Sequence, residues 1–146
     1  MDGVLSPMAD PQAQVVGYDG HSAWGKVMTS AVRSAPACDG DGKLIVYSLC
    51  VGKATLAKVQ NAYPKAQVVT TFGEGFFLAD KNEQLVKGEG VESLLALVDG
   101  IGNRESWDSL HRSMNGTNHY GSRTWENIIT PENVGVRGKV LDADGD

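Results

Sequence analysis

The chain has 146 residues, of which 41% are hydrophobic and 21% charged, with a formal net charge of −5. This length and composition are typical of one globular domain and exclude global disorder. The acidic balance and the lack of a Lys/Arg cluster argue against nucleic acid as a partner. No apolar run reaches the roughly 20 residues that span a bilayer, and the first residues lack a signal-peptide pattern, so we expect no membrane partner.

The first half of the chain predicts strands and helices in alternation. Residues 1–13 show no hydrophobic period, and we interpret them as a linker or an added end segment before a single α/β domain over residues 14–146. Val15–Tyr18 predicts a strand, and Ser22 is the expected N-cap of a helix that follows. The apolar face of this helix, which we expect in the core or at an interface, consists of Trp24, Val27, Met28, Ala31 and Val32.

A turn rich in Gly and Asp leads to a second predicted strand over Leu44–Leu49. A second helix carries Leu56, Val59 and Tyr63 on one face and ends before a proline, and residues 67–71 predict a third strand. Right-handed crossovers place three such strands in one sheet. The fold class predicted from this βαβαβ order is α/β, a three-layer sandwich with a mainly parallel sheet.

The second half predicts a smaller extension of this core. It contains a hairpin, two helices, a loop and edge strands, which we expect in this order over residues 76–87, 91–98, 107–114, 115–121 and 125–141.

Each of the first two predicted strands leads to a residue with catalytic chemistry, His21 after the first and Cys50 after the second. Neighbouring parallel strands end at the same edge of a sheet, so we expect these side chains to lie side by side. An imidazole beside a thiol forms a nucleophile with its base, and the second helix, beginning near Gly52, would favour a thiolate. The other cysteine, Cys38, lies in a Pro- and Gly-rich turn, and both thiols are predicted to be free.

The order strand, His21, helix, turn, strand, Cys50 resembles the clan CD cysteine peptidases, a group that includes caspases, clostripain-like enzymes and self-processing domains of bacterial toxins. The resemblance extends from Val15 to about Gly75. The same segment is also similar to polymorphic-toxin and effector domains of bacteria. The resemblance implies a cysteine-dependent hydrolase that cuts a peptide or amide bond with a Cys-His dyad and no cofactor. It further implies a peptide or protein substrate, an inhibitor or immunity protein as partner, and delivery within a larger secreted protein.

The resemblance also suggests roles for residues around the dyad. Gly20 and Asp19 are the candidates for an oxyanion donor and an orienting group. Gly73 and Glu74 are candidates for substrate binding beyond the third strand, and the alternative for this segment is a solvent-facing turn with a charged tip. Ser22 departs from the family pattern, which has glycine after the histidine, and its Cβ would narrow the approach to the backbone N–H there. The residue before Cys50 is likewise Leu49 where the family has a small residue.

Two other functions stay open. The same fold without a working site would be a catalytically inactive, toxin-associated binding module. The segment Gly20–Lys26 also fits the G-x-x-x-x-G-K pattern of a phosphate-binding loop, which makes a degenerate nucleotide binder the third hypothesis. Val27 stands where that motif needs Ser or Thr to bind magnesium, and the next strand ends without an Asp.

No metal site is expected. Asp39 and Asp41 lack the spaced Glu of a calcium loop, as do the aspartates near the C-terminus, Asp142, Asp144 and Asp146. His111 and His119 have no ligand at zinc spacing, and we interpret them as a helix-surface and a loop residue. His119 is kept as a candidate for a second catalytic centre.

Overall fold

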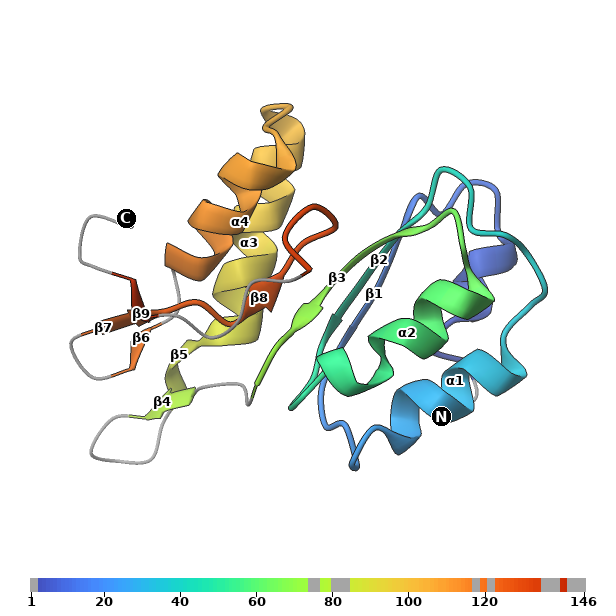
Figure 1. Ribbon diagram of the computed structural model, residues 1–146, viewed down its shortest axis with the longest axis horizontal. Coiled ribbons are helices and arrows are strands. Elements are labelled where there is room, and N and C mark those ends of the chain that lie inside the picture. The colour runs from blue at the N-terminus through green and yellow to red at the C-terminus, as the bar shows by residue number, and fades with distance from the viewer. Residues whose placement is uncertain are drawn as a thin grey trace. The chain divides into compact units, whose positions relative to one another are not determined.

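The computed structural model describes residues 3–73, 77–79, 85–116, 119–120, 123–134 and 140–141. The chain divides into two compact units, Met1–Thr71 and Phe72–Asp146, whereas the sequence predicted one domain after residue 13. Figure 1 shows the elements of each unit, which are described separately below. Among the described residues, no helix has both the length and the apolar character needed to cross a membrane.

The first unit contains a parallel sheet of β1 (Val15–Asp19), β2 (Leu44–Ser48) and β3 (Gln67–Thr71), with β2 between the other two. The register pairs Val16 with Ile45 and Ile45 with Val68. β2 is buried from Leu44 to Tyr47, as is typical of a central parallel strand with an unbroken apolar run. The predicted α/β class and βαβαβ order are confirmed.

Two helices connect these strands, α1 (Lys26–Ser34) and α2 (Lys53–Ala62). They contact each other and lie on the same face of the sheet (Figure 1), so the first unit by itself supplies two layers of the predicted sandwich. The core between helices and sheet contains the expected periodic residues, Val27, Met28, Ala31, Leu56 and Val59.

The start of α1 differs from the prediction. The N-cap is Gly25, with a left-handed φ of 78°, instead of Ser22, and no side chain caps the helix. Ala23 and Trp24 also have positive φ values, 45° and 60°, which a right-handed helix cannot contain. Trp24 therefore precedes the helix and is exposed, so its predicted place on the apolar face of this helix was wrong, and of the two expected locations the core is excluded.

The segment before β1, predicted to be a linker, packs onto the first unit. It contains a short 3-10 helix, η1 (Ser6–Ala9), and the side chains of Leu5 and Met8 are buried. The ammonium of Lys43 donates a hydrogen bond to the carbonyl of Ala13 at 2.6 Å. Residues 5–13 thus belong to the structure of this unit.

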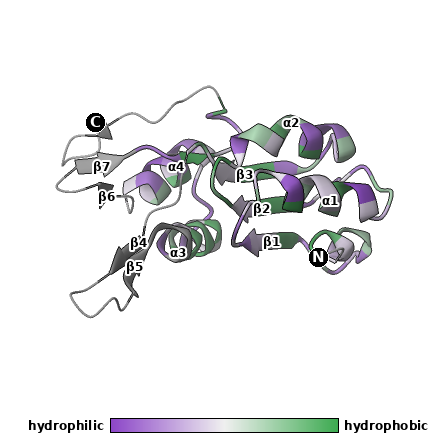
Figure 2. Cartoon of the chain, turned by 90° about the horizontal axis from the view of Figure 1, so that it is seen from below, coloured by the Kyte–Doolittle hydropathy of each residue, from purple (hydrophilic) through white to green (hydrophobic). Residues whose placement is uncertain are grey.

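The second unit begins with an antiparallel pair of strands, β4 (Phe77–Ala79) and β5 (Leu85–Gly88), which confirms the predicted hairpin. The helices α3 (Glu89–Gly102) and α4 (Trp107–Gly116) follow and pack against each other. They approach so closely that a Cβ at Gly100 would overlap the side chain of Leu110. Figure 2 shows that α3 is the more hydrophobic of the two helices.

Short strands complete the second unit. β6 (His119–Tyr120), β7 (Arg123–Trp125) and β9 (Val140–Leu141) form an antiparallel sheet with β7 in the middle, and β8 (Ile128–Ile129) is buried. The loop prediction for residues 115–121 is therefore wrong for residues 115–116, which belong to α4, and for His119 and Tyr120, which form β6.

Candidate functional site

His21 and Cys50 follow neighbouring parallel strands at the same edge of the sheet. Asp19 is opposite Ser48 in the register of β1 and β2, and each catalytic candidate comes two residues after its member of this pair. Both side chains are exposed. Within the described part of the chain, no hydrogen bond joins the imidazole to the thiol. Catalytic hydrogen bonds are often long or poorly aligned in structures without substrate.

A tight turn presents Cys50 between β2 and α2. Val51 has a φ of 57°, a left-handed conformation that costs about 1–2 kcal/mol for a residue other than glycine and is rare for a β-branched one. The next residue, Gly52, donates its N–H to the Leu49 carbonyl and to Thr71 Oγ1, both at 3.2 Å. The hydroxyl of Thr71 in turn donates to the Leu49 carbonyl. These bonds hold the strained turn in place.

Glycine is required at the end of this turn. A Cβ at Gly52 would lie 2.9 Å from Thr71 Oγ1 and closer still to Thr70 Oγ1, both on buried side chains of β3. The carbonyl of Gly52 accepts hydrogen bonds from Thr55 Oγ1 at 3.0 Å and from Tyr47 Oη at 3.3 Å. The buried face of the sheet thus fixes the backbone that presents Cys50 to solvent.

The loop that carries His21 is tied to the sheet at two points. The N–H of Gly20 donates to the Ser48 carbonyl at 3.2 Å, and Tyr18 Oη donates to the His21 carbonyl at 3.3 Å. Sequence reasoning missed the role of Tyr18, although its spacing of three residues from His21 is suited to such a contact. Further along, the loop meets the first turn of α2, because a Cβ at Gly25 would lie 3.0 Å from Thr55 Cγ2.

The other predicted site residues have more restricted roles. The N–H of Gly20 is used by Ser48, so it would have to leave the sheet to stabilise an oxyanion. Asp19 is exposed, and in the described structure it makes no hydrogen bond to His21 that would orient the imidazole. The N–H of Gly73 donates to Asn127 Oδ1 at 2.6 Å, within the second unit. Glu74 lies outside the described residues.

Cys38 provides an internal comparison for Cys50. Both thiols are free, as predicted, but Cys38 is half-buried and Cys50 is exposed. The thiol of Cys38 lies 3.6 Å from the Met8 carbonyl and donates to it, which ties this side chain to the N-terminal segment. Cys50 has no such bond among the described residues.

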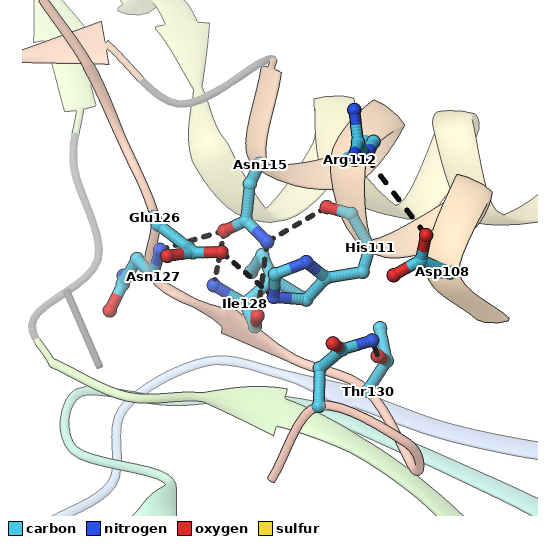
Figure 3. A network of polar contacts seen from close by, with 9 residues as sticks. Asp108, His111, Arg112, Asn115, Glu126, Asn127, Ile128 and Thr130 are labelled. Atoms are coloured by element: carbon cyan, nitrogen blue, oxygen red, sulfur yellow. Dashed lines mark hydrogen bonds and ion pairs between the residues drawn. The ribbon is translucent and has the colours of Figure 1, made fainter. Parts of the chain in front are cut away.

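A buried polar cluster in the second unit centres on Asn115 of α4 (Figure 3). Its Oδ1 accepts the N–H groups of Asn127 and Ile128, both at 2.7 Å. Its Nδ2 donates to the carbonyls of His111 at 2.8 Å and Ile128 at 3.1 Å. The carbonyl of Asn127 accepts the N–H of Phe72 at 2.6 Å. The carboxamide of Asn115 therefore helps to fix residues 126–128 between α4 and the start of the unit.

His111 belongs to the same cluster and is buried at 5% exposure, which corrects the prediction of a helix-surface residue. Its Nε2 lies 3.3 Å from Glu126 Oε1 (Figure 3). Burial lowers the pKa of His111, an effect that the negative charge of Asp108 opposes and the positive charge of Arg112 supports. The sequence signal was helical spacing, because His111 and Asn115 follow directly after the buried apolar residues Leu110 and Met114.

Metal and nucleotide sites find no support. Among the residues that the structure describes, no group of three or more His, Cys, Asp or Glu side chains could hold a metal ion. Val27, at the position of the magnesium-binding hydroxyl in a phosphate-binding loop, is a buried residue of α1 and lies in the core. Comparisons with known protein families, with curated proteins and with solved structures found no match for this chain.

Proposed function

We propose that this chain is a cysteine-dependent hydrolase that acts on a peptide or amide bond, with Cys50 as nucleophile and His21 as general base and then acid. The observation that carries the proposal is the register of β1 and β2, which brings an exposed thiol and an exposed imidazole to the same edge of a parallel sheet. This edge is where open α/β sheets place their chemistry. The resemblance to clan CD peptidases supports the same pair of residues.

In the proposed reaction, His21 accepts the thiol proton as the sulfur of Cys50 attacks the carbonyl carbon. The tetrahedral intermediate collapses, and the imidazolium gives its proton to the departing amine. This leaves a thioester on Cys50. Water then attacks the thioester with His21 as base, which releases the acid and restores the thiol.

Two structural features support this chemistry. Cys50 lies three residues before α2, whose N-terminal end favours negative charge nearby. The turn around Val51 holds a left-handed conformation, and strain of this kind is concentrated at functional sites. The competing hypothesis is a binding module of the same fold in which the thiol has no role.

Acyl transfer from p-nitrophenyl acetate tests the proposal, because this ester needs no specific substrate pocket. We expect a burst of p-nitrophenol equal to the protein concentration, with the acetyl group on Cys50 in the mass spectrum. Cys50→Ala should lose the burst, and His21→Ala should slow it by at least about 100-fold, the usual contribution of a general base. Cys38→Ala is the matched control and should keep it. An undiminished burst in Cys50→Ala would overturn the proposal.

A further inference from the structure

Two large apolar side chains are displayed to solvent at the edge that carries His21 and Cys50. Trp24 is 97% exposed and Val51 is 47% exposed. In the described part of the first unit, the other exposed large hydrophobic residue is Val15, at the opposite end of β1. The carboxyl edge therefore combines the candidate dyad with apolar surface that the core of this unit does not use.

The backbone conformation, and not the rotamer of a side chain, determines this exposure. Ala23, Trp24 and Val51 are the non-glycine residues with left-handed φ among those described in the first unit, and all three lie at this edge. The turn at Val51 is fixed by the bonds of Gly52 to β2 and β3. A helical start at Ser22, as the sequence predicted, would have buried Trp24, so the left-handed residues of the loop take it out of the core.

The loop of Trp24 and the turn of Val51 are near neighbours. Gly25, next to Trp24, approaches Thr55, which lies in the first turn of α2 only four residues after Val51. Val51 in turn follows Cys50 directly. The two exposed apolar residues therefore come from two loops that approach each other at this edge, and Val51 adjoins the candidate nucleophile.

We propose that Trp24 and Val51 form the subsite for the substrate side chain next to the scissile bond, and that this side chain is aromatic or long and aliphatic. The inference rests on the proposed function and names its substrate class. An indole also attracts cations, but Lys26 follows two residues after Trp24, and the N-terminal ends of α1 and α2 face the same edge. These positive groups disfavour a Lys or Arg side chain, and the exposed carboxylate of Asp19 at the end of β1 disfavours an Asp or Glu side chain at the same edge, which leaves a neutral apolar one.

Peptide acyloxymethyl ketones test this preference, since the thiolate displaces the carboxylate leaving group and forms a thioether. Four probes with Phe, Leu, Lys or Asp beside the ketone are compared by their second-order rate of labelling at Cys50, read by mass spectrometry. Each rate is divided by the iodoacetamide rate of the same variant, which removes differences in thiol reactivity. We expect the Phe and Leu probes to react at least ten times faster than the Lys and Asp probes.

Variants assign this selectivity to the two side chains. Trp24→Ala should reduce the preference for Phe over Lys to less than threefold, Trp24→Phe should keep most of it, and Val51→Ala should reduce it in part. Val15→Ala, which removes an exposed apolar side chain at the other end of β1, is the matched control and should keep it. Equal rates with all four probes, or a preference that survives Trp24→Ala, would overturn the inference. Failure of the proposed function would give a different result: iodoacetamide would label Cys50 at a rate that does not depend on His21.

Discussion

The carboxyl edge of the first unit and the polar cluster of the second unit differ in the exposure and hydrogen bonding of their polar and reactive side chains. At the edge, Cys50 and His21 are exposed, and neither side chain makes a hydrogen bond within the described residues. In the cluster, Asn115 is fully buried, and both atoms of its carboxamide are bonded to backbone groups. Polar groups that are buried and satisfied hold a structure together, whereas groups left without partners at a sheet edge are available to a substrate.

Each unit also contains a feature that lowers its stability, namely backbone strain at the edge and desolvation in the cluster. The edge contains left-handed residues such as Val51, whose strain is offset by the bonds around Gly52. The cluster buries His111 beside Glu126, and the desolvation of the imidazole lowers its pKa. The first feature presents a side chain to solvent, and the second fixes one segment against another. Substitutions that separate these two roles test the contrast.

Removal of the Asn115 amide should produce the largest change in stability. Asn115→Ala leaves the N–H groups of Asn127 and Ile128 buried without their acceptor, and each such loss costs about 1–3 kcal/mol. We expect a loss of about 3 kcal/mol or more in the free energy of unfolding, measured by urea denaturation. Asn133→Ala, which removes a half-buried bond to Thr130, is the control and should cost less than about 1 kcal/mol. Equal effects of the two substitutions would contradict a structural role for the cluster.

A methyl group at Gly52 should disturb the edge and its chemistry together. Gly52→Ala forces Cβ into the buried hydroxyls of Thr70 and Thr71, so the turn must shift, at an expected cost of about 2–3 kcal/mol. We also expect slower alkylation of Cys50. Gly102→Ala has open space around the new Cβ and should change stability by less than about 1 kcal/mol. If Gly52→Ala kept both stability and Cys50 reactivity, the turn would not be what presents the thiol.

The smallest expected effect is the contribution of His111 to the pH dependence of the free energy of unfolding. Burial lowers the pKa of this residue below its ordinary value of 6.5, so the unfolded chain binds more protons between the two pKa values. The stability contributed by neutral His111 is therefore fully present above pH 6.5 and is lost as the pH falls through the folded pKa. His111→Gln should reduce the change of the urea midpoint between about pH 7.5 and 5.5, whereas Asn133→Ala, which removes no titratable group, should keep it. The same slope in both variants would exclude His111 as its source.

The core of the first unit could be predicted because its sequence follows simple periods. Short apolar runs such as Leu44–Leu49 and helical spacing such as Leu56 with Val59 indicate strands and helices directly, and right-handed crossovers place the strands in one parallel sheet. The same reasoning placed His21 and Cys50 after neighbouring strands. What it could not give was the backbone of the connecting loops, where Trp24 matches the helical period but has a left-handed φ.

The second unit was less predictable because its key contacts join residues far apart in the sequence. Asn115 bonds to residues 127 and 128, and Asn127 bonds to residues 72 and 73. No local pattern announces such partners, and a polar residue in a helix is more often a surface residue. His111 was therefore predicted at the surface, although it follows a buried leucine in α4.

The relative rates at which iodoacetamide alkylates Cys50 and Cys38 test the central claim most directly, since both thiols are in the same protein. If His21 activates Cys50, this thiol should react at least about ten times faster than Cys38 near neutral pH, and His21→Ala should remove most of the difference. Cys38 should keep its rate in that variant. Equal rates in the parent protein, or a fast Cys50 that His21→Ala leaves unchanged, would contradict the dyad.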